Sequence, residues 1–299
     1  MYKKIIILLL IIVICMTGCT NKQPDEGNDN PSNNITQTEN IDSNGDMIMA
    51  VSLDETEEKI TETFTHESLG KITFIHSTTS SIESLNNGEI ARGDVLIIGD
   101  FQYTFMKQYD GEKYVDWEHN GFTVKAIKEK ETYEDMYDVL FNAQVISADY
   151  CFYNNKLLKT PPHLSSKVSS TNHCFDGCTN LVFDDIAMYL HTLTYLNTTQ
   201  YMFANCDAIT NADMYQGEIQ DTTGMFFNCK NLTQFTTISD DVQTANNMFE
   251  GCINLTGEIF IGSNIKSYND IFKDTVKNIT LIGENSSIIA EKYTNVKGE

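Results

Sequence analysis

The chain has 299 residues, with 42 acidic side chains against 20 basic ones and a formal net charge of −22 at pH 7. A surface this acidic repels the phosphates of nucleic acids and of anionic lipid headgroups, so the composition argues against both classes of partner, and no nucleic-acid partner is expected.

The first 18 residues have the pattern of a signal peptide. Lys3 and Lys4 precede an apolar run at 5–14, and the stretch "MTGC" follows at 16–19. The apolar run is shorter than the roughly 20 residues that a membrane-spanning helix needs. Its ending resembles a bacterial lipobox, whose cysteine is diacylated and becomes the new N-terminus. We therefore expect Cys19 to carry a lipid; the alternative is a plain secretory signal in which Cys19 has no role.

Residues 19–45 are predicted to be a disordered tether. The segment contains only two strongly apolar residues, Ile35 and Ile41, and no aromatic residue. It cannot bury enough surface to offset its chain entropy.

Residues 46–127 are predicted to form a small β-rich domain. Apolar and polar residues alternate around Gly99-Asp100 and again around Asn120-Gly121, and both dipeptides are typical of hairpin turns. Residues 128–144 place apolar side chains on one helical face, and we expect this helix to cap the first coil of the array that follows.

A phrase with a central phenylalanine recurs from residue 145 to residue 278. The phenylalanines are 23, 28, 23, 23 and 23 residues apart. A fixed period of this length is typical of a solenoid, in which each repeat is one coil that packs on its neighbours. The aligned core residues are Phe152, Phe175, Phe203, Phe226, Phe249 and Phe272. The fold class is therefore an α/β repeat, a solenoid of about six 23-residue coils, and residues 279–299 would close its C-terminal end.

Two residues after each phenylalanine stands an Asn, Gly or Asp. These residue types best tolerate the left-handed backbone conformation. We expect each coil to contain one helical turn that ends at this position and is followed by a short strand.

Four cysteines share one column of the repeat, namely Cys178, Cys206, Cys229 and Cys252. Three interpretations are open. The column can be a packing position, which its replacement by Asn155 and Thr275 in the end copies favours. Adjacent coils can bring Cys151 near Cys174 for a disulfide, and a metal site is the third option, although it usually needs close pairs of ligands.

The 28-residue step places five extra residues within 183–200. Insertions in solenoids map to loops on one face, and some of these form binding sites. Because the segment is apolar, we expect it to pack over a neighbouring coil.

No nucleophile, metal-protease or phosphate-loop motif is present, and no cofactor is expected. The six histidines are scattered, and His173 stands at a repeat position that looks exposed and replaceable. The acid pairs Asp184-Asp185 and Asp240-Asp241 have the residue types of a glycosidase, but such pairs in an acidic protein usually face solvent.

The phrases "MFEGCINL" at 248–255 and "CFDGCTNL" at 174–181, with Pro161-Pro162 and "NGFTVKAI" at 120–127, resemble the BspA-like leucine-rich repeat proteins. The resemblance implies a right-handed leucine-rich solenoid on a surface protein or lipoprotein of the bacterial cell envelope. It also implies non-catalytic adhesion to host or microbial surface proteins or glycoproteins. Two alternatives are a structural envelope-assembly lipoprotein without an external ligand and a hydrolase seated in residues 46–127.

Overall fold

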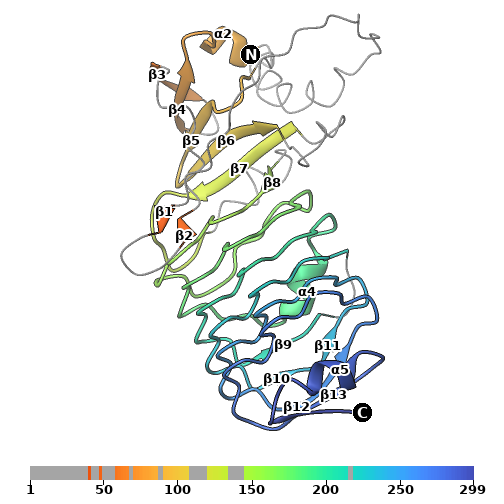
Figure 1. The fold of residues 1–299 in the computed structure, drawn as a ribbon. Helices are drawn as coiled ribbons and strands as arrows, with labels where there is room; N and C mark the ends of the chain where they lie inside the picture. The colour runs from red at the N-terminus through yellow and green to blue at the C-terminus, as the bar shows by residue number, and fades with distance from the viewer. Residues whose placement is uncertain are drawn as a thin grey trace, which may run out of the picture.

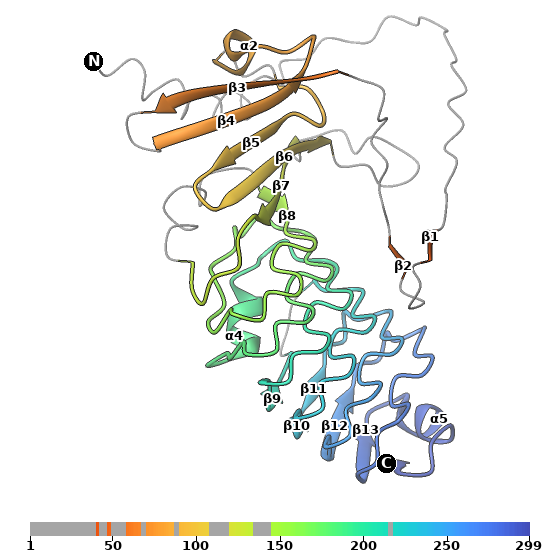
Figure 2. The ribbon, with the colours of Figure 1, turned by 90° about the vertical axis from the view of Figure 1, so that its left-hand side faces the viewer.

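The computed structural model describes residues 40–41, 47–48, 58–66, 70–86, 90–107, 120–133, 145–214 and 218–299. A sheet at the N-terminal end leads into a stack of coils that ends at the C-terminus (Figures 1 and 2). No helix in these ranges is long and apolar enough to cross a membrane.

Short strands dominate the described chain. The strands before the coils are β1 (Asn40–Ile41), β2 (Met47–Ile48), β3 (Lys59–His66), β4 (Gly70–Ser77), β5 (Val95–Ile98), β6 (Phe101–Lys107) and β7 (Asn120–Ala126). Those within and after the coils are β8 (Val145–Ser147), β9 (Asn211–Ala212), β10 (Gln234–Phe235), β11 (Thr237–Ile238), β12 (Gly257–Ile261), β13 (Ile279–Ile282) and β14 (Val296–Gly298). The helices are α2 (Ile82–Asn86), α4 (Ile186–His191) and α5 (Ser286–Ala290).

Six strands form the N-terminal sheet in the order β3-β4-β5-β6-β7-β8. Gly99-Asp100 joins β5 to β6 as a two-residue turn, since Ile98 pairs with Phe101, and this hairpin was predicted. The prediction of a hairpin turn at Asn120-Gly121 is wrong. Both residues lie inside β7 and pair with the end of β6, so long-range pairing overrides the local turn signal.

The sheet continues into the coils because β8 is both its last strand and the start of the first repeat. Of the predicted capping helix at 128–144, residues 128–133 are not helical, and 134–144 lie outside the described residues. Tyr133 covers the first coil instead. Its ring centroid lies 5.1 Å from that of Phe152 and 5.2 Å from that of Phe101.

The signal peptide and Cys19 also lie outside the described residues. Strand β1 lies within the predicted tether and pairs antiparallel with β2, which lies just after the tether, so a two-residue strand stands where disorder was expected.

The six coils begin at Val145, Val168, Leu196, Ile219, Val242 and Ile265. A single column of isolated parallel bridges links consecutive coils, from Ser147 to Ser267. Next to it lies the segment that we call the turn segment, which runs from four residues before the phenylalanine to two residues after it. We number the coils 1 to 6; coil 2 spans 168–195 and carries the five-residue insertion.

The backbone hydrogen bonds that join consecutive coils in the turn segment all run in one direction. In each of coils 1 to 5, four alternate residues donate their N–H groups to carbonyl oxygens of the next coil, at 2.7–3.1 Å. In coil 4, for example, Phe226 N–H donates to Met248 O and Asn228 N–H donates to Glu250 O. The residues between them mostly donate to the carbonyl three positions earlier in their own coil. The expected helical turn is therefore a run of tight turns whose backbone groups are shared with the next coil.

This geometry needs left-handed residues at two positions of each coil. The position two after the phenylalanine has positive φ throughout, as the Asn, Gly and Asp column predicted. The position two before it also has positive φ, which the sequence did not reveal. Its occupants are Tyr150, His173, Tyr201, Gly224, Asn247 and Asp270.

Inside the coils the repeat phenylalanines form a continuous stack. Their ring centroids lie 5.4–5.9 Å apart, with interplanar angles of 1–23°. All six rings are essentially inaccessible to solvent. The cysteine column lies beside them, and each thiol donates to the phenylalanine carbonyl of the preceding coil. The Cys229 Sγ atom, for example, lies 3.0 Å from Phe203 O.

The six cysteines of the described residues are free and buried, which favours the packing interpretation of the column. Burial raises the pKa of the Cys178 and Cys252 thiols to about 12, so they stay protonated donors at neutral pH. The end copies keep a buried polar residue: Asn155 bonds to the Tyr133 hydroxyl, and Thr275 to Phe272 O.

On the far side of the coils, short parallel strands follow the leucine column. Strands β11, β12, β13 and β14 form one sheet, and β9 and β10 form another. The C-terminal segment adds α5 and β14 as a last turn, whose Tyr293 packs edge-on against Phe272.

The ring stack predicts a large difference between two phenylalanines. Phe226→Ala removes a fully buried ring with neighbours on both sides and should lower the free energy of unfolding by about 3–5 kcal/mol. Phe260→Ala is the matched control, because that side chain projects from β12 and is 37% exposed. Its cost should be about 0.5 kcal/mol. Guanidinium unfolding of fragment 20–299 followed by circular dichroism measures both, and equal losses would contradict the stack.

Candidate binding surface on the solenoid

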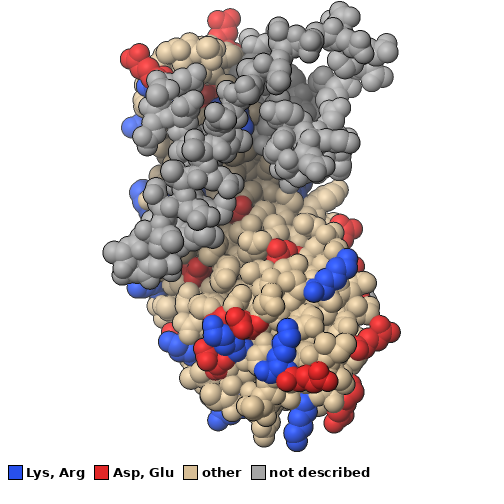
Figure 3. Space-filling view, viewed as in Figure 1, with Lys and Arg blue, Asp and Glu red and all other residues tan. Residues whose placement is uncertain are grey.

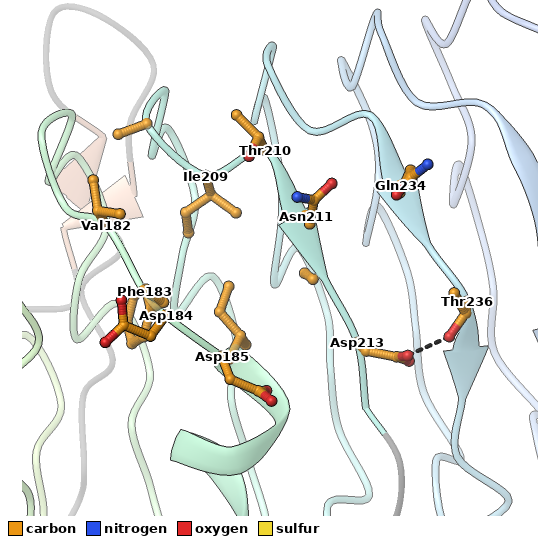
Figure 4. A pocket seen from close by; sticks show the side chains of 13 residues that line it. Val182, Phe183, Asp184, Asp185, Ile209, Thr210, Asn211, Asp213, Gln234 and Thr236 are labelled. Atoms are coloured by element: carbon orange, nitrogen blue, oxygen red, sulfur yellow. Dashed lines mark hydrogen bonds between the residues drawn. The ribbon is translucent and has the colours of Figure 1, made fainter.

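A groove of about 300 Å³ opens on the strand side of the solenoid, where the insertion of coil 2 meets coil 3 (Figure 4). One wall is residues 182–186, which lead into α4. The other wall is 208–213, which includes β9, and Gln234 and Thr236 of coil 4 extend it.

The groove exists because the strand ladder is interrupted there. In other coils the residue that directly follows the leucine column donates its backbone N–H to the carbonyl oxygen of the equivalent residue in the previous coil. Val182 N–H lies 3.0 Å from Lys159 O, and Thr233 N–H lies 2.8 Å from Thr210 O. Among the described residues no such bond joins Thr210 to Val182. Strand β9 consequently pairs with β10 alone and turns its other edge toward the groove.

The insertion itself is held against the coils, as its apolar composition predicted. Tyr189 of α4 is buried, its ring packs edge-on against Phe175 and Phe183, and its hydroxyl donates to Pro162 O at 2.9 Å. The groove wall formed by residues 182–186 is therefore held in place.

Three carboxylates line the lower part of the groove, and they differ in their hydrogen-bond partners (Figure 4). Asp213 accepts hydrogen bonds from Thr236 Oγ1, Thr237 N and Met214 N. Asp185 caps α4 by accepting from Met188 N at 2.9 Å. Asp184 is exposed and has no hydrogen-bond partner among the described residues.

On the turn side, three rings form a second stack near the surface. The His173 ring lies between Tyr150 and Tyr201, with centroid distances of 4.7 and 4.9 Å and interplanar angles of 9°. His173 Nδ1 lies 2.8 Å from an Asp176 carboxylate oxygen. The expectation that His173 is exposed is therefore wrong, since it is half-buried in a ring stack. A Cβ at Gly224 would fall 2.2 Å from the Tyr201 ring, so the stack ends there.

One member of each acid pair has a structural role. Asp240 accepts from the backbone N–H and hydroxyl of Ser263, and these bonds hold the pKa of its carboxyl below the ordinary value. Asp185 serves as the cap of α4, as described above.

His76 is the buried histidine of the N-terminal sheet. Its Nδ1 lies 2.8 Å from Ser77 O and its Nε2 lies 3.2 Å from a Glu62 carboxylate oxygen. Neither ring nitrogen contacts a hydroxyl of the described residues, so no nucleophile and base meet there. Within the described ranges, no three His, Cys, Asp or Glu side chains are arranged to hold a metal ion.

Charge on the solenoid is mixed rather than concentrated. On the face of the solenoid seen in Figure 3, Lys side chains lie among Asp and Glu side chains, with uncharged surface between them. Sequence reasoning found the insertion but missed both the groove and the ring stack. Gly224, Asn247 and Asp270 tolerate positive φ in the same column as these rings, but the aromatic occupants in the first three coils hid this second left-handed position.

Comparison with known families gives one match. Six copies of the BspA-type leucine-rich repeat region cover residues 145–280. No curated protein and no solved structure matches the chain. The matched range coincides with the six stacked coils, and residues 145–280 therefore form an array of BspA-type leucine-rich repeats.

Proposed function

We propose that the protein is anchored to the bacterial cell envelope by a lipid on Cys19 and is exposed at the cell surface. There it binds host or microbial surface proteins or glycoproteins through the strand side of the solenoid, without catalysis. BspA-type repeats indicate a surface protein of the protein-interaction or adhesion type. The observation that carries the proposal is the array of six such repeats with one open strand side.

Side chains on the strand side have the composition of a recognition surface. Along β10 and β12 the inward residues Phe235 and Ile259 are buried, whereas Gln234, Glu258 and Phe260 point outward and are exposed. A patch that mixes amides, charges and an aromatic ring is typical of non-obligate interfaces. The turn side is less suited, because its alternate N–H and carbonyl groups are consumed between coils.

The first test is direct binding by fragment 20–299 to matrix proteins, mucin, epithelial cells and whole bacteria. At least one member of the panel should bind saturably. The variant Gln234→Arg/Phe260→Arg, which places two bulky cations on the strand side, should weaken that binding at least tenfold.

The matched control is Gln220→Arg/Gln243→Arg, which adds the same charge beside the bridge column. It should bind as the unaltered fragment does. Absence of saturable binding across the panel would overturn the proposal in favour of a structural envelope role, and equal losses in the two variants would move the site off the strand side.

Lipid anchoring is tested separately on the full chain produced in a bacterium with lipoprotein processing. The chain should incorporate an alkyne-labelled palmitate and partition into detergent. Cys19→Ser should abolish both properties, because no other residue of the "MTGC" stretch has a thiol. Cys15→Ser is the control for the neighbouring cysteine, and undiminished labelling of Cys19→Ser would contradict the anchor.

A further inference from the structure

The groove between coils 2 and 3 contains an unpaired strand edge. Strand β9 has β10 on one side, and on the other side the ladder to coil 2 is missing. The edge of a strand presents a row of backbone N–H and C=O groups that an added strand can pair with. For β12 and β13 the preceding coil supplies that strand; for β9 nothing in the described residues does.

The interruption is confined to one side of the molecule. On the turn side, Thr171, His173, Phe175 and Gly177 of coil 2 still donate to coil 3 at 2.8–3.1 Å. The rings of Phe175 and Phe203 remain stacked at 5.8 Å. The two coils are therefore fixed relative to each other, and the groove is a preformed feature that need not open for a ligand.

The lining of the groove is also negatively charged. The described lining includes Asp184, Asp185 and Asp213 but no lysine, arginine or histidine. The Asp213 carboxylate accepts from three donors, whereas Asp184 has no partner among the described residues and Asp185 uses one oxygen to cap α4. Two carboxylates at the rim thus have acceptor capacity for cationic side chains.

Other ligand classes fit less well. A metal ion is disfavoured because no group of three ligating side chains converges within the described residues. A phosphate or sulfate would face carboxylates and no cation. An extended peptide uses both features of the site, since its backbone matches the strand edge and its basic side chains match the rim.

We propose that this groove binds an extended polypeptide segment that carries Lys or Arg at alternate positions. The segment adds as a strand to the free edge of β9, and its basic side chains lie beside Asp184 and Asp185. This inference rests on the proposed function, because it names the chemistry of the macromolecular segment that the strand side recognises.

The test uses fragment 20–299 and a fluorescent octapeptide of alternating Lys and Val, measured by fluorescence anisotropy. The peptide should bind saturably, and an octapeptide of alternating Glu and Val should not. Asp184→Asn/Asp185→Asn should weaken binding about tenfold; asparagine is also a good helix cap, so α4 should be retained. Asp240→Asn/Asp241→Asn removes the same charge from an acid pair elsewhere and should change binding less than about twofold.

Strand addition is tested with two N-methylated peptides, one modified on every Lys and one on every Val. Pairing along one edge uses the N–H groups of alternate residues, so one of the two should lose at least tenfold in affinity. The proposal is overturned if neither loses affinity, if the two acid-pair variants weaken binding equally, or if the Lys-Val peptide does not bind. Should the peptide fail while the panel still binds fragment 20–299, the inference falls and the proposed function stands.

Discussion

The backbone hydrogen bonds between coils in the turn segment run one way along the stack and hold the coils in register. Each of coils 1 to 5 donates four N–H groups to the next coil, and each of coils 2 to 6 accepts four from the coil before it. Alternate residues can point their N–H groups the same way only if two positions per coil adopt positive φ, which is costly for most side chains. The recurrent Asn, Gly and Asp residues around each phenylalanine follow from this requirement.

Side chains then complete what the backbone begins. Coil spacing set by the turn segment brings consecutive phenylalanine rings to 5.4–5.9 Å, a distance suited to stacking. The cysteine column fits beside the rings because a thiol is small, apolar enough to be buried and still able to donate to a carbonyl. A larger apolar residue would lack that donor.

The same constraint explains how the solenoid tolerates a break. The insertion of coil 2 disrupts the ladder on the strand side, yet the turn side carries the register across the interruption without change. A binding groove can therefore arise in the middle of a regular array without loss of the array. In the proposed function the two sides have separate roles, with recognition on the strand side and cohesion on the turn side.

The repeat was predictable from sequence because its columns are chemically uniform. Phe152 to Phe272 and the Asn, Gly and Asp residues two places later gave the period, the core and one left-handed position. The second left-handed position was hidden, because Tyr150, His173 and Tyr201 are not residues that favour positive φ, and tertiary bonds impose it on them. The turn signal at Asn120-Gly121 misled because pairing with β6 is a long-range interaction. The groove was not predictable, since the apolar residues of 183–200 reveal that the insertion packs but not that one edge of β9 has no partner strand among the described residues.

The proposed recognition surface is the strand side of the solenoid and not the turn side. Amide hydrogen exchange of fragment 20–299, with and without the tightest-binding member of the panel, tests it most directly. Slower exchange on binding within 208–213 and 233–237, with unchanged exchange in the turn segments around Phe203 and Phe226, is the predicted result. Protection concentrated in the turn segments, or in the N-terminal sheet, would contradict it.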